Sequence, residues 1–139
     1  MQDNVRQLRE RSIDTEKITI NLGFVDLGRI DLLVQEGFYS NRSDCIRTAI
    51  RNHLADHAPD VAQSVARQTL EVGLRDYSAA ELEALRDQGR TLNVRVLGLA
   101  RIATDVTPDL ARATIASMTV LGALHATPEV RAALAGRIH

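Results

Sequence analysis

The stretch that decides the fold is Lys17-Ile18-Thr19-Ile20-Asn21-Leu22, which is followed by a helix-like segment and then by Gly37-Phe38-Tyr39-Ser40-Asn41-Arg42-Ser43. In the first six residues, apolar and polar side chains alternate at the period of a β-strand. The apolar face carries Ile18, Ile20 and Leu22, and the polar face carries Lys17, Thr19 and Asn21. We therefore expect a strand that buries one face and contacts a polar partner with the other.

Two amphipathic helices are predicted after this strand. The first is expected to begin at Asp26 as its N-cap and to stop at Gly37. The second is expected to begin at Ser40 as its N-cap, and its apolar stripe consists of Ile46, Ala49, Ile50 and Leu54. One strand with two helices has unpaired edges and nowhere to place its apolar face. A second chain must therefore supply the missing strand.

The strand, the helix after it and the Gly-x-Tyr-Ser-Asn-Arg-Ser turn together resemble the CopG-like ribbon-helix-helix transcriptional regulators, over about residues 16–57. The resemblance implies an intertwined homodimer whose two strands form an antiparallel ribbon in the major groove of double-stranded DNA. It further implies a sequence-specific transcriptional regulator, most simply a repressor. Many relatives have a proline soon after the strand, where this chain has Leu22-Gly23-Phe24-Val25. The resemblance therefore does not define where the first helix starts.

The polar face of the strand is predicted to contact DNA bases through Lys17, Thr19 and Asn21. Lysine suits guanine O6 and N7, asparagine suits adenine N6 and N7, and threonine can meet a base edge or a thymine methyl group. The alternative is that these are ordinary solvent-facing strand residues.

The start of the second helix is predicted to contact DNA phosphates. Unpaired backbone N–H groups and the helix dipole favour an anion there. By the resemblance, the phosphate-contacting residues are Ser40, Asn41, Arg42 and Ser43. They would position the ribbon rather than read bases. The alternative is a plain helix cap without a ligand.

Composition limits where and how the chain can act. A net charge of −1 gives no general attraction to nucleic acid, so basic groups would have to act locally. Residues 1–16 are expected to form a flexible arm, either a solvated tail without a ligand or an arm whose Arg6, Arg9 and Arg11 contact the DNA backbone. This polar arm does not resemble a signal peptide, and no stretch is apolar enough to cross a bilayer. We expect a cytoplasmic protein without a membrane partner.

Residues 58–139 are predicted to form a separate C-terminal domain for oligomerisation or sensing, after a ribbon-helix-helix domain at residues 17–57. A third helix is expected from Pro59, with an apolar stripe reaching Leu70 and Leu74. A fourth helix is expected between the capping box Ser78-Ala79-Ala80-Glu81 and Gly89. With the small strand-helix-strand-helix region that follows, the expected fold class is α+β.

That last region contains an internal repeat. Val96-Leu97-Gly98 precedes Thr107-Pro108-Asp109, and Val120-Leu121-Gly122 precedes Thr127-Pro128-Glu129. Each copy predicts a strand and then a helix capped by threonine, and Leu92–Val96 alternates as the first strand. Repeat arrays normally need at least three units, and two would leave strand edges open. We therefore expect the sheet to be completed by another subunit or by other strands of the chain.

No catalytic, metal or cofactor site is predicted. His53 and His57 are spaced i, i+4, but two ligands do not complete a metal site. Ser43 and His53 are almost three helical turns apart, too far for a nucleophile and its base. Cys45 is best explained as a small buried side chain. We therefore do not expect an enzyme.

Two other functions are compatible with the same DNA reader. One is an antitoxin, whose C-terminal tail would bind a toxin protein. The capped helices and apolar strands of residues 58–139 argue against such a tail, which is usually disordered when free. The other is an architectural or segregation protein that coats DNA by self-association of its C-terminal region.

Overall fold

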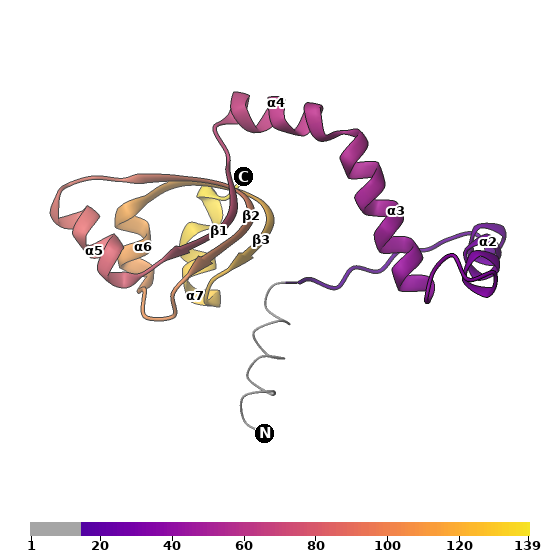
Figure 1. Cartoon of the computed structure of the whole chain (residues 1–139). Coiled ribbons are helices and arrows are strands. Elements are labelled where there is room, and N and C mark those ends of the chain that lie inside the picture. Colours follow the sequence, from indigo (N-terminus) through magenta and orange to yellow (C-terminus); the bar gives the residue numbers. More distant parts are fainter. Residues whose placement is uncertain (1–14) are drawn as a thin grey trace, which may run out of the picture. The chain divides into compact units, whose positions relative to one another are not determined.

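The structure is a computed structural model that describes residues 15–139. Residues 1–14, with the Arg6, Arg9 and Arg11 of the expected arm, lie outside the described residues. The described chain divides into two compact units, residues 15–64 and 65–139 (Figure 1). Helices and strands alternate only in the second unit, which gives the described chain an α+β composition.

The unit of residues 15–64 is built from helices. Residues 15–23 run without regular secondary structure into α2 (Phe24–Gln35), which is followed by α3 (Arg42–Asp56). The helix α4 (Ala58–Gln68) begins in this unit and ends in the next. The predicted strand at residues 17–22 has no strand partner among the described residues of the chain, so it stays a prediction.

The ends of α2 and α3 follow local rules, with two corrections to the expected starts. Gly37 has φ of +85° and terminates α2, and the backbone N–H of Phe38 reaches back to the carbonyl of Leu33. Helix α2 begins earlier than expected, with Gly23 and not Asp26 at its N-cap position. Helix α3 is capped by Asn41 and not by Ser40, because the Asn41 side chain accepts the N–H of Asp44 at 2.8 Å.

The unit of residues 65–139 is a parallel three-stranded sheet with a helix after each strand. The elements are β1 (Glu71–Tyr77), α5 (Ala79–Asp87), β2 (Leu92–Ile102), α6 (Pro108–Thr114), β3 (Ile115–His125), α7 (Pro128–Leu134) and the short 3-10 turn η1 (Ala135–Arg137). The strand order is β1-β2-β3. The three helices lie on one side of the sheet, and the strands bend around them (Figure 1).

The expected third helix was wrong beyond residue 68. Residues 71–77, including Leu74, form β1 and pair with Val96–Ile102 of β2, and Leu70 precedes this strand. Thr69, with φ of +55°, breaks the helical path just before it. Spacing alone suggested a helix because apolar residues at 70 and 74 fit either period. Tertiary pairing decides in favour of the strand.

This correction supplies the third copy of the repeat. Gly73, Gly98 and Gly122 stand side by side across the three strands, and all three have positive φ. The helix caps repeat as well, because Ser78, Thr107 and Thr127 each accept a backbone N–H three residues later. Three units meet the usual minimum for a repeat array.

The core of this unit lies between the sheet and its helices. Alternate β2 residues Val94, Val96, Ala100 and Ile102 are buried. From the helices and β3 come Leu82, Leu110, Ala111, Met118, Val130 and Leu134, each at most 3% exposed. Val72 of β1 and Leu121 of β3 lie on the opposite face of the sheet, away from the helices, and are exposed. One face of the sheet is therefore packed and the other is open.

Candidate nucleic-acid interface

The residues predicted to contact bases lie on the segment that leads into α2. Lys17, Thr19 and Asn21 are all exposed. Placing their side chains on one face requires a strand, and residues 15–23 pair with no strand in the described part of the chain, residues 15–139. The structure therefore places these residues on an accessible segment, and their joint role in base contact stays a prediction.

The apolar residues that alternate with them are exposed as well. Ile18 is 72%, Ile20 56% and Leu22 41% exposed. Aliphatic side chains at such exposure forgo the free energy that burial gives, about 25 cal/mol for each Å² removed from water. Within one chain the described residues therefore leave all three side chains exposed to solvent.

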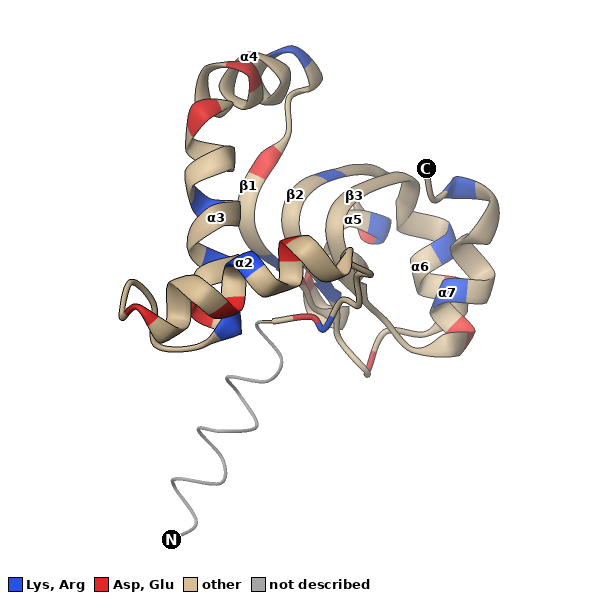
Figure 2. Ribbon diagram, turned by 90° about the vertical axis from the view of Figure 1, so that its right-hand side faces the viewer, with Lys and Arg blue, Asp and Glu red and all other residues tan. Residues whose placement is uncertain are grey.

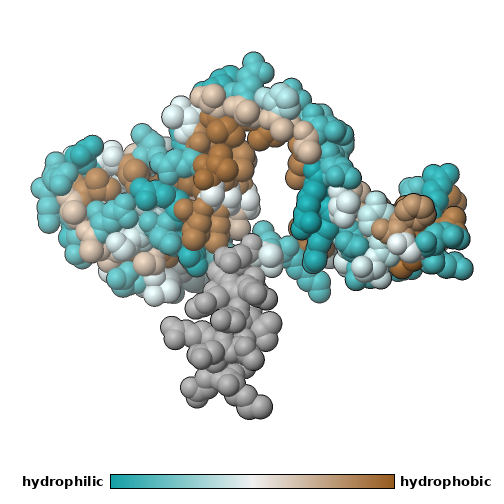
Figure 3. All heavy atoms as spheres, in the orientation of Figure 1, coloured by the Kyte–Doolittle hydropathy of each residue, from teal (hydrophilic) through white to brown (hydrophobic). Residues whose placement is uncertain are grey.

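The same holds for the helices of this unit. Cys45 is its only buried residue. Its exposed large apolar residues, besides those of the segment just described, are Phe24, Val25, Leu32, Leu33, Phe38, Ile50, Leu54 and Val61. Figure 3 shows apolar surface on this unit as brown atoms. A unit with so many exposed apolar side chains lacks a core of its own.

The N-terminus of α3 is already partly satisfied by its own side chains. The Asn41 side chain caps the helix, and the backbone N–H of Ser40 donates to the Asp44 carboxylate at 2.9 Å. Asp44 therefore brings a negative charge to the place predicted for a phosphate. Ser40, Asn41 and Ser43 remain exposed, so they stay accessible to a ligand.

Arg42 makes a contact that sequence reasoning missed. Its guanidinium binds the Asp31 carboxylate through two hydrogen bonds, Nε to Oδ1 at 2.7 Å and Nη2 to Oδ2 at 2.8 Å. The pKa of Asp31 is lowered mainly by this hydrogen bond, and the pKa of Arg42 is raised by it. The pair joins the start of α3 to α2. The two residues are eleven positions apart in the sequence and lie on different helices, so no helical period links them.

Charge on these two helices is mixed. Figure 2 shows that the positions of basic and acidic residues are interspersed along α2 and α3. Asp31 neutralises Arg42, whereas the exposed Arg47 and Arg51 of α3 form no ion pair with another residue of the described part of the chain. Phosphate binding by this surface would therefore depend on a few local groups.

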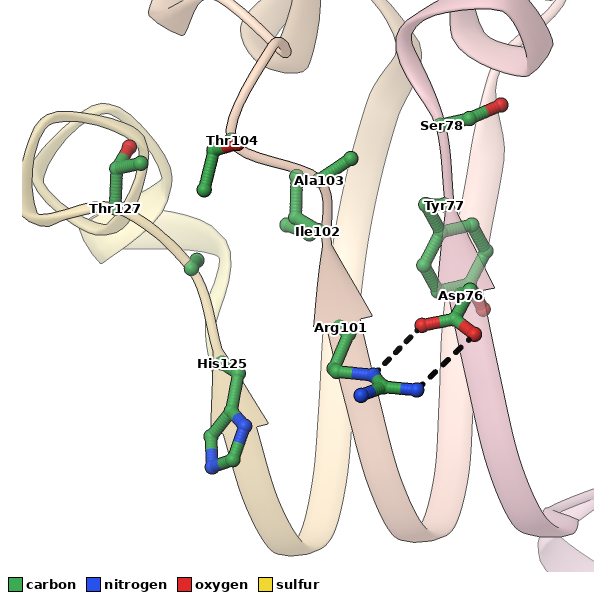
Figure 4. A pocket seen from close by; sticks show the side chains of 10 residues that line it. Asp76, Tyr77, Ser78, Arg101, Ile102, Ala103, Thr104, His125 and Thr127 are labelled. Atoms are coloured by element: carbon green, nitrogen blue, oxygen red, sulfur yellow. Dashed lines mark hydrogen bonds and ion pairs between the residues drawn. The ribbon is translucent and has the colours of Figure 1, made fainter. Parts of the chain in front are cut away.

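The unit of residues 65–139 contains a separate hollow of about 450 Å³. It lies at the carboxyl ends of the three strands, where ligands commonly bind in α/β sheets. Asp76, Arg101 and His125 stand in one row across the strands at its edge (Figure 4). Arg101 donates to Asp76 at 2.8 Å, so the two charges offset each other. Nothing in this lining selects a ligand class, and a sensing role stays a prediction.

Histidines and acids do not gather elsewhere in the described chain. The rings of His53 and His57 meet edge to face with centroids 4.9 Å apart, and His57 pairs with Asp60 at 3.1 Å. Within residues 15–139 no group of three or more metal-ligating side chains is found. No helix of this part of the chain is long and apolar enough to cross a membrane.

Comparison with known proteins matches the chain to one family model. Residues 13–131 match the model of the ribbon-helix-helix transcriptional regulator family. The matched range includes the unit of residues 15–64 and most of the unit of residues 65–139. Neither the curated proteins nor the solved structures gave a match.

Proposed function

Because the chain belongs to the ribbon-helix-helix transcriptional regulator family, a family of regulators and not of enzymes, we propose that it represses transcription by binding specific double-stranded DNA sites as a homodimer. Proteins of this family bind DNA and dimerise.

The observation that carries the proposal is the exposed apolar surface of residues 15–64. In the proposed dimer, residues 17–22 of two chains pair as an antiparallel ribbon and turn Ile18, Ile20 and Leu22 inward. Pairing of the two strands also gives hydrogen-bond partners to backbone N–H and C=O groups that are unpaired in a single strand. The exposed side chains of α2 and α3 then pack in a shared core. The dimer thus provides the strand partner and the apolar core that residues 15–64 of a single chain do not have.

In this arrangement the ribbon enters the major groove with Lys17, Thr19 and Asn21 outward. An amine, a hydroxyl and an amide from each strand offer the donors and acceptors that distinguish base pairs there. Two-fold symmetry of the protein calls for a palindromic or repeated site. Ser40, Asn41, Arg42 and Ser43 bind the flanking phosphates, with Arg42 held in place by Asp31.

The test is DNA binding by matched variants on a site selected from random duplexes. Asn21→Ala should weaken binding to the selected site by about tenfold to a hundredfold and relax its preference at one base pair. Asn52→Ala removes the same side chain from an exposed position on α3 and should leave binding unchanged. Equal loss on selected and random DNA would contradict base reading by Asn21.

Footprinting separates this function from DNA coating. A repressor should protect one compact site, and repression of a reporter should follow occupancy of that site. Protection that spreads along the duplex with protein concentration would favour the coating function instead.

A further inference from the structure

The sheet of residues 65–139 ends on one side at β1. Within the described residues, β1 pairs with β2 alone, so no other strand of this part of the chain covers that edge. The opposite edge is partly covered, because Ile138 bridges Met118 of β3 and the backbone N–H of His139 donates to the Met118 carbonyl at 2.8 Å. An open edge is a template for pairing with another strand.

The sequence of β1 is self-complementary around Gly73. If a second β1 runs antiparallel with the two Gly73 residues opposite, Glu71 faces Arg75 of the partner subunit and Val72 faces Leu74 of the partner subunit. Opposite charges and apolar pairs directly across an antiparallel ladder are both favourable. Both pairs occur twice, because the arrangement is two-fold symmetric.

Neighbouring registers lose this match. A shift by one residue in one direction places Glu71 opposite Asp76 of the partner subunit, which sets two acids against each other. The opposite shift places Glu71 opposite Leu74 of the partner subunit. The charge pattern therefore selects the register centred on Gly73.

The side chains concerned are available. Val72 is 68% and Leu74 53% exposed on the open face of the sheet. On the other face, Glu71 and Arg75 are 64% and 43% exposed, and they bind each other at 3.1 Å across the bend at Gly73. In the paired state, Glu71 would bind Arg75 of the partner subunit in place of Arg75 of its own chain, so the number of Glu71–Arg75 ion pairs is unchanged. The contacts between Val72 and Leu74 of the partner subunit are gained in addition. Figure 3 shows brown, apolar surface on the unit to which these strands belong.

Gly73 also leaves room for the approach of another backbone. A side chain on Gly98 would clash with the carbonyl of Gly73, and one on Gly122 with the carbonyl of Gly98. At Gly73 the equivalent space has no atom of the described chain within 4 Å.

We propose that β1 is a self-association strand that pairs antiparallel with β1 of a second copy about Gly73 and joins two three-stranded sheets into one. The inference concerns the C-terminal unit and does not rest on DNA binding. Its occupant is a second copy of this chain.

Disulfide trapping in the full chain tests the register. The double variant Val72→Cys/Leu74→Cys places cysteines directly across the proposed ladder, within the distance a disulfide spans. Under mild oxidation a disulfide-linked dimer should become the main species. The matched control Leu97→Cys/Leu99→Cys puts the same pair of cysteines at the register partners of residues 72 and 74 on the central strand β2, both edges of which are already paired. Equal trapping in both variants would overturn the proposal.

Charge exchange tests the same ladder independently. In the trapping variant, Glu71→Arg or Arg75→Glu alone places like charges opposite and should lower the linked fraction about tenfold. Co-expression of the two single variants restores opposite charges only between different copies, so linked heterodimers should form. Failure of this rescue, with both variants folded by circular dichroism, would refute the pairing, because an ion pair within one chain cannot be rescued by another.

A DNA-binding variant separates this inference from the proposed function. Lys17→Ala lies outside the C-terminal unit and should reduce binding to DNA while leaving the disulfide yield of the trapping variant unchanged. Loss of trapping with intact DNA binding would reject the β1 pairing alone.

Discussion

At the scale of single residues, the contact between Asp31 and Arg42 changes what a basic side chain can do. Arg42 is expected to bind phosphate, yet its Nε and Nη2 already bind a carboxylate. A guanidinium has five N–H donors, so it can hold Asp31 and still present the remaining ones to DNA. Asp31 therefore orients Arg42 while reducing the local positive charge.

This contact predicts an acid-dependent change. The hydrogen bond from Arg42 lowers the pKa of Asp31, so the folded carboxyl releases its proton below the value of an unfolded aspartate, about 3.9. A lowered folded pKa contributes stability that is complete above the unfolded pKa and is lost as pH falls through the folded pKa. A carboxyl-detected NMR titration should find this low pKa, and Arg42→Ala should return it to the ordinary range. An ordinary pKa in the unchanged protein would contradict the pairing.

At the scale of the element, the strands of the second unit owe their bend to a column of glycines. Gly98 has φ of +138° and Gly122 +124°, a region that other residues avoid. The carbonyl of the preceding strand also fills the space where a side chain would lie. These positions therefore demand glycine for two separate reasons.

Gly98→Ala should destabilise the unit of residues 65–139 by about 3 kcal/mol or more, the sum of backbone strain and steric clash. Gly136→Ala is the matched control, because Gly136 has no atom within 4 Å of the added methyl group and its φ is not positive. It should change stability by less than about 1 kcal/mol. Urea unfolding of both variants measures the difference, and similar values would argue against the glycine column.

In each repeat a side-chain cap fixes the residue at which the helix begins. Thr107→Ala removes the acceptor for the N–H of Leu110 at the start of α6 and should cost about 1 kcal/mol of unfolding free energy. Thr104→Ala, in the exposed turn before that helix, should cost less. Thermal unfolding of the two variants provides the comparison, and an equal loss would show that the cap does not hold α6.

At the scale of the whole molecule, the two units differ in where their stability comes from. Residues 65–139 surround their own core, whereas Cys45 is the only buried residue of residues 15–64. The first unit is thus expected to fold together with its partner, so its stability is coupled to protein concentration.

Hydrogen exchange should reveal that difference. Amide protection in α2 and α3 should rise with protein concentration over a range where protection in β2 stays constant. Ile20→Asp puts a charge in the proposed shared core and should remove protection of α2 and α3 and abolish specific DNA binding. Asn52→Asp adds the same charge on an exposed helix surface and should do neither. Full protection at the lowest concentration would mean that this unit folds alone.

The sequence by itself was sufficient to predict the features that depend on near neighbours. The stop at Gly37 and the helix caps at Ser78, Thr107 and Thr127 form as expected, because each links groups within five residues. The family assignment rested on the same kind of local pattern, and the family match confirms it.

Only the tertiary structure decided the features that depend on distant partners. The spacing of Leu74 fits a helical stripe, but in the structure this residue pairs with β2 as part of a strand. Gly73 is recognised as a repeat position only from its alignment with Gly98 and Gly122 across the sheet. Arg42 meets Asp31 because two helices pack together. In each case the deciding free energy comes from contacts between segments that sequence spacing does not bring together.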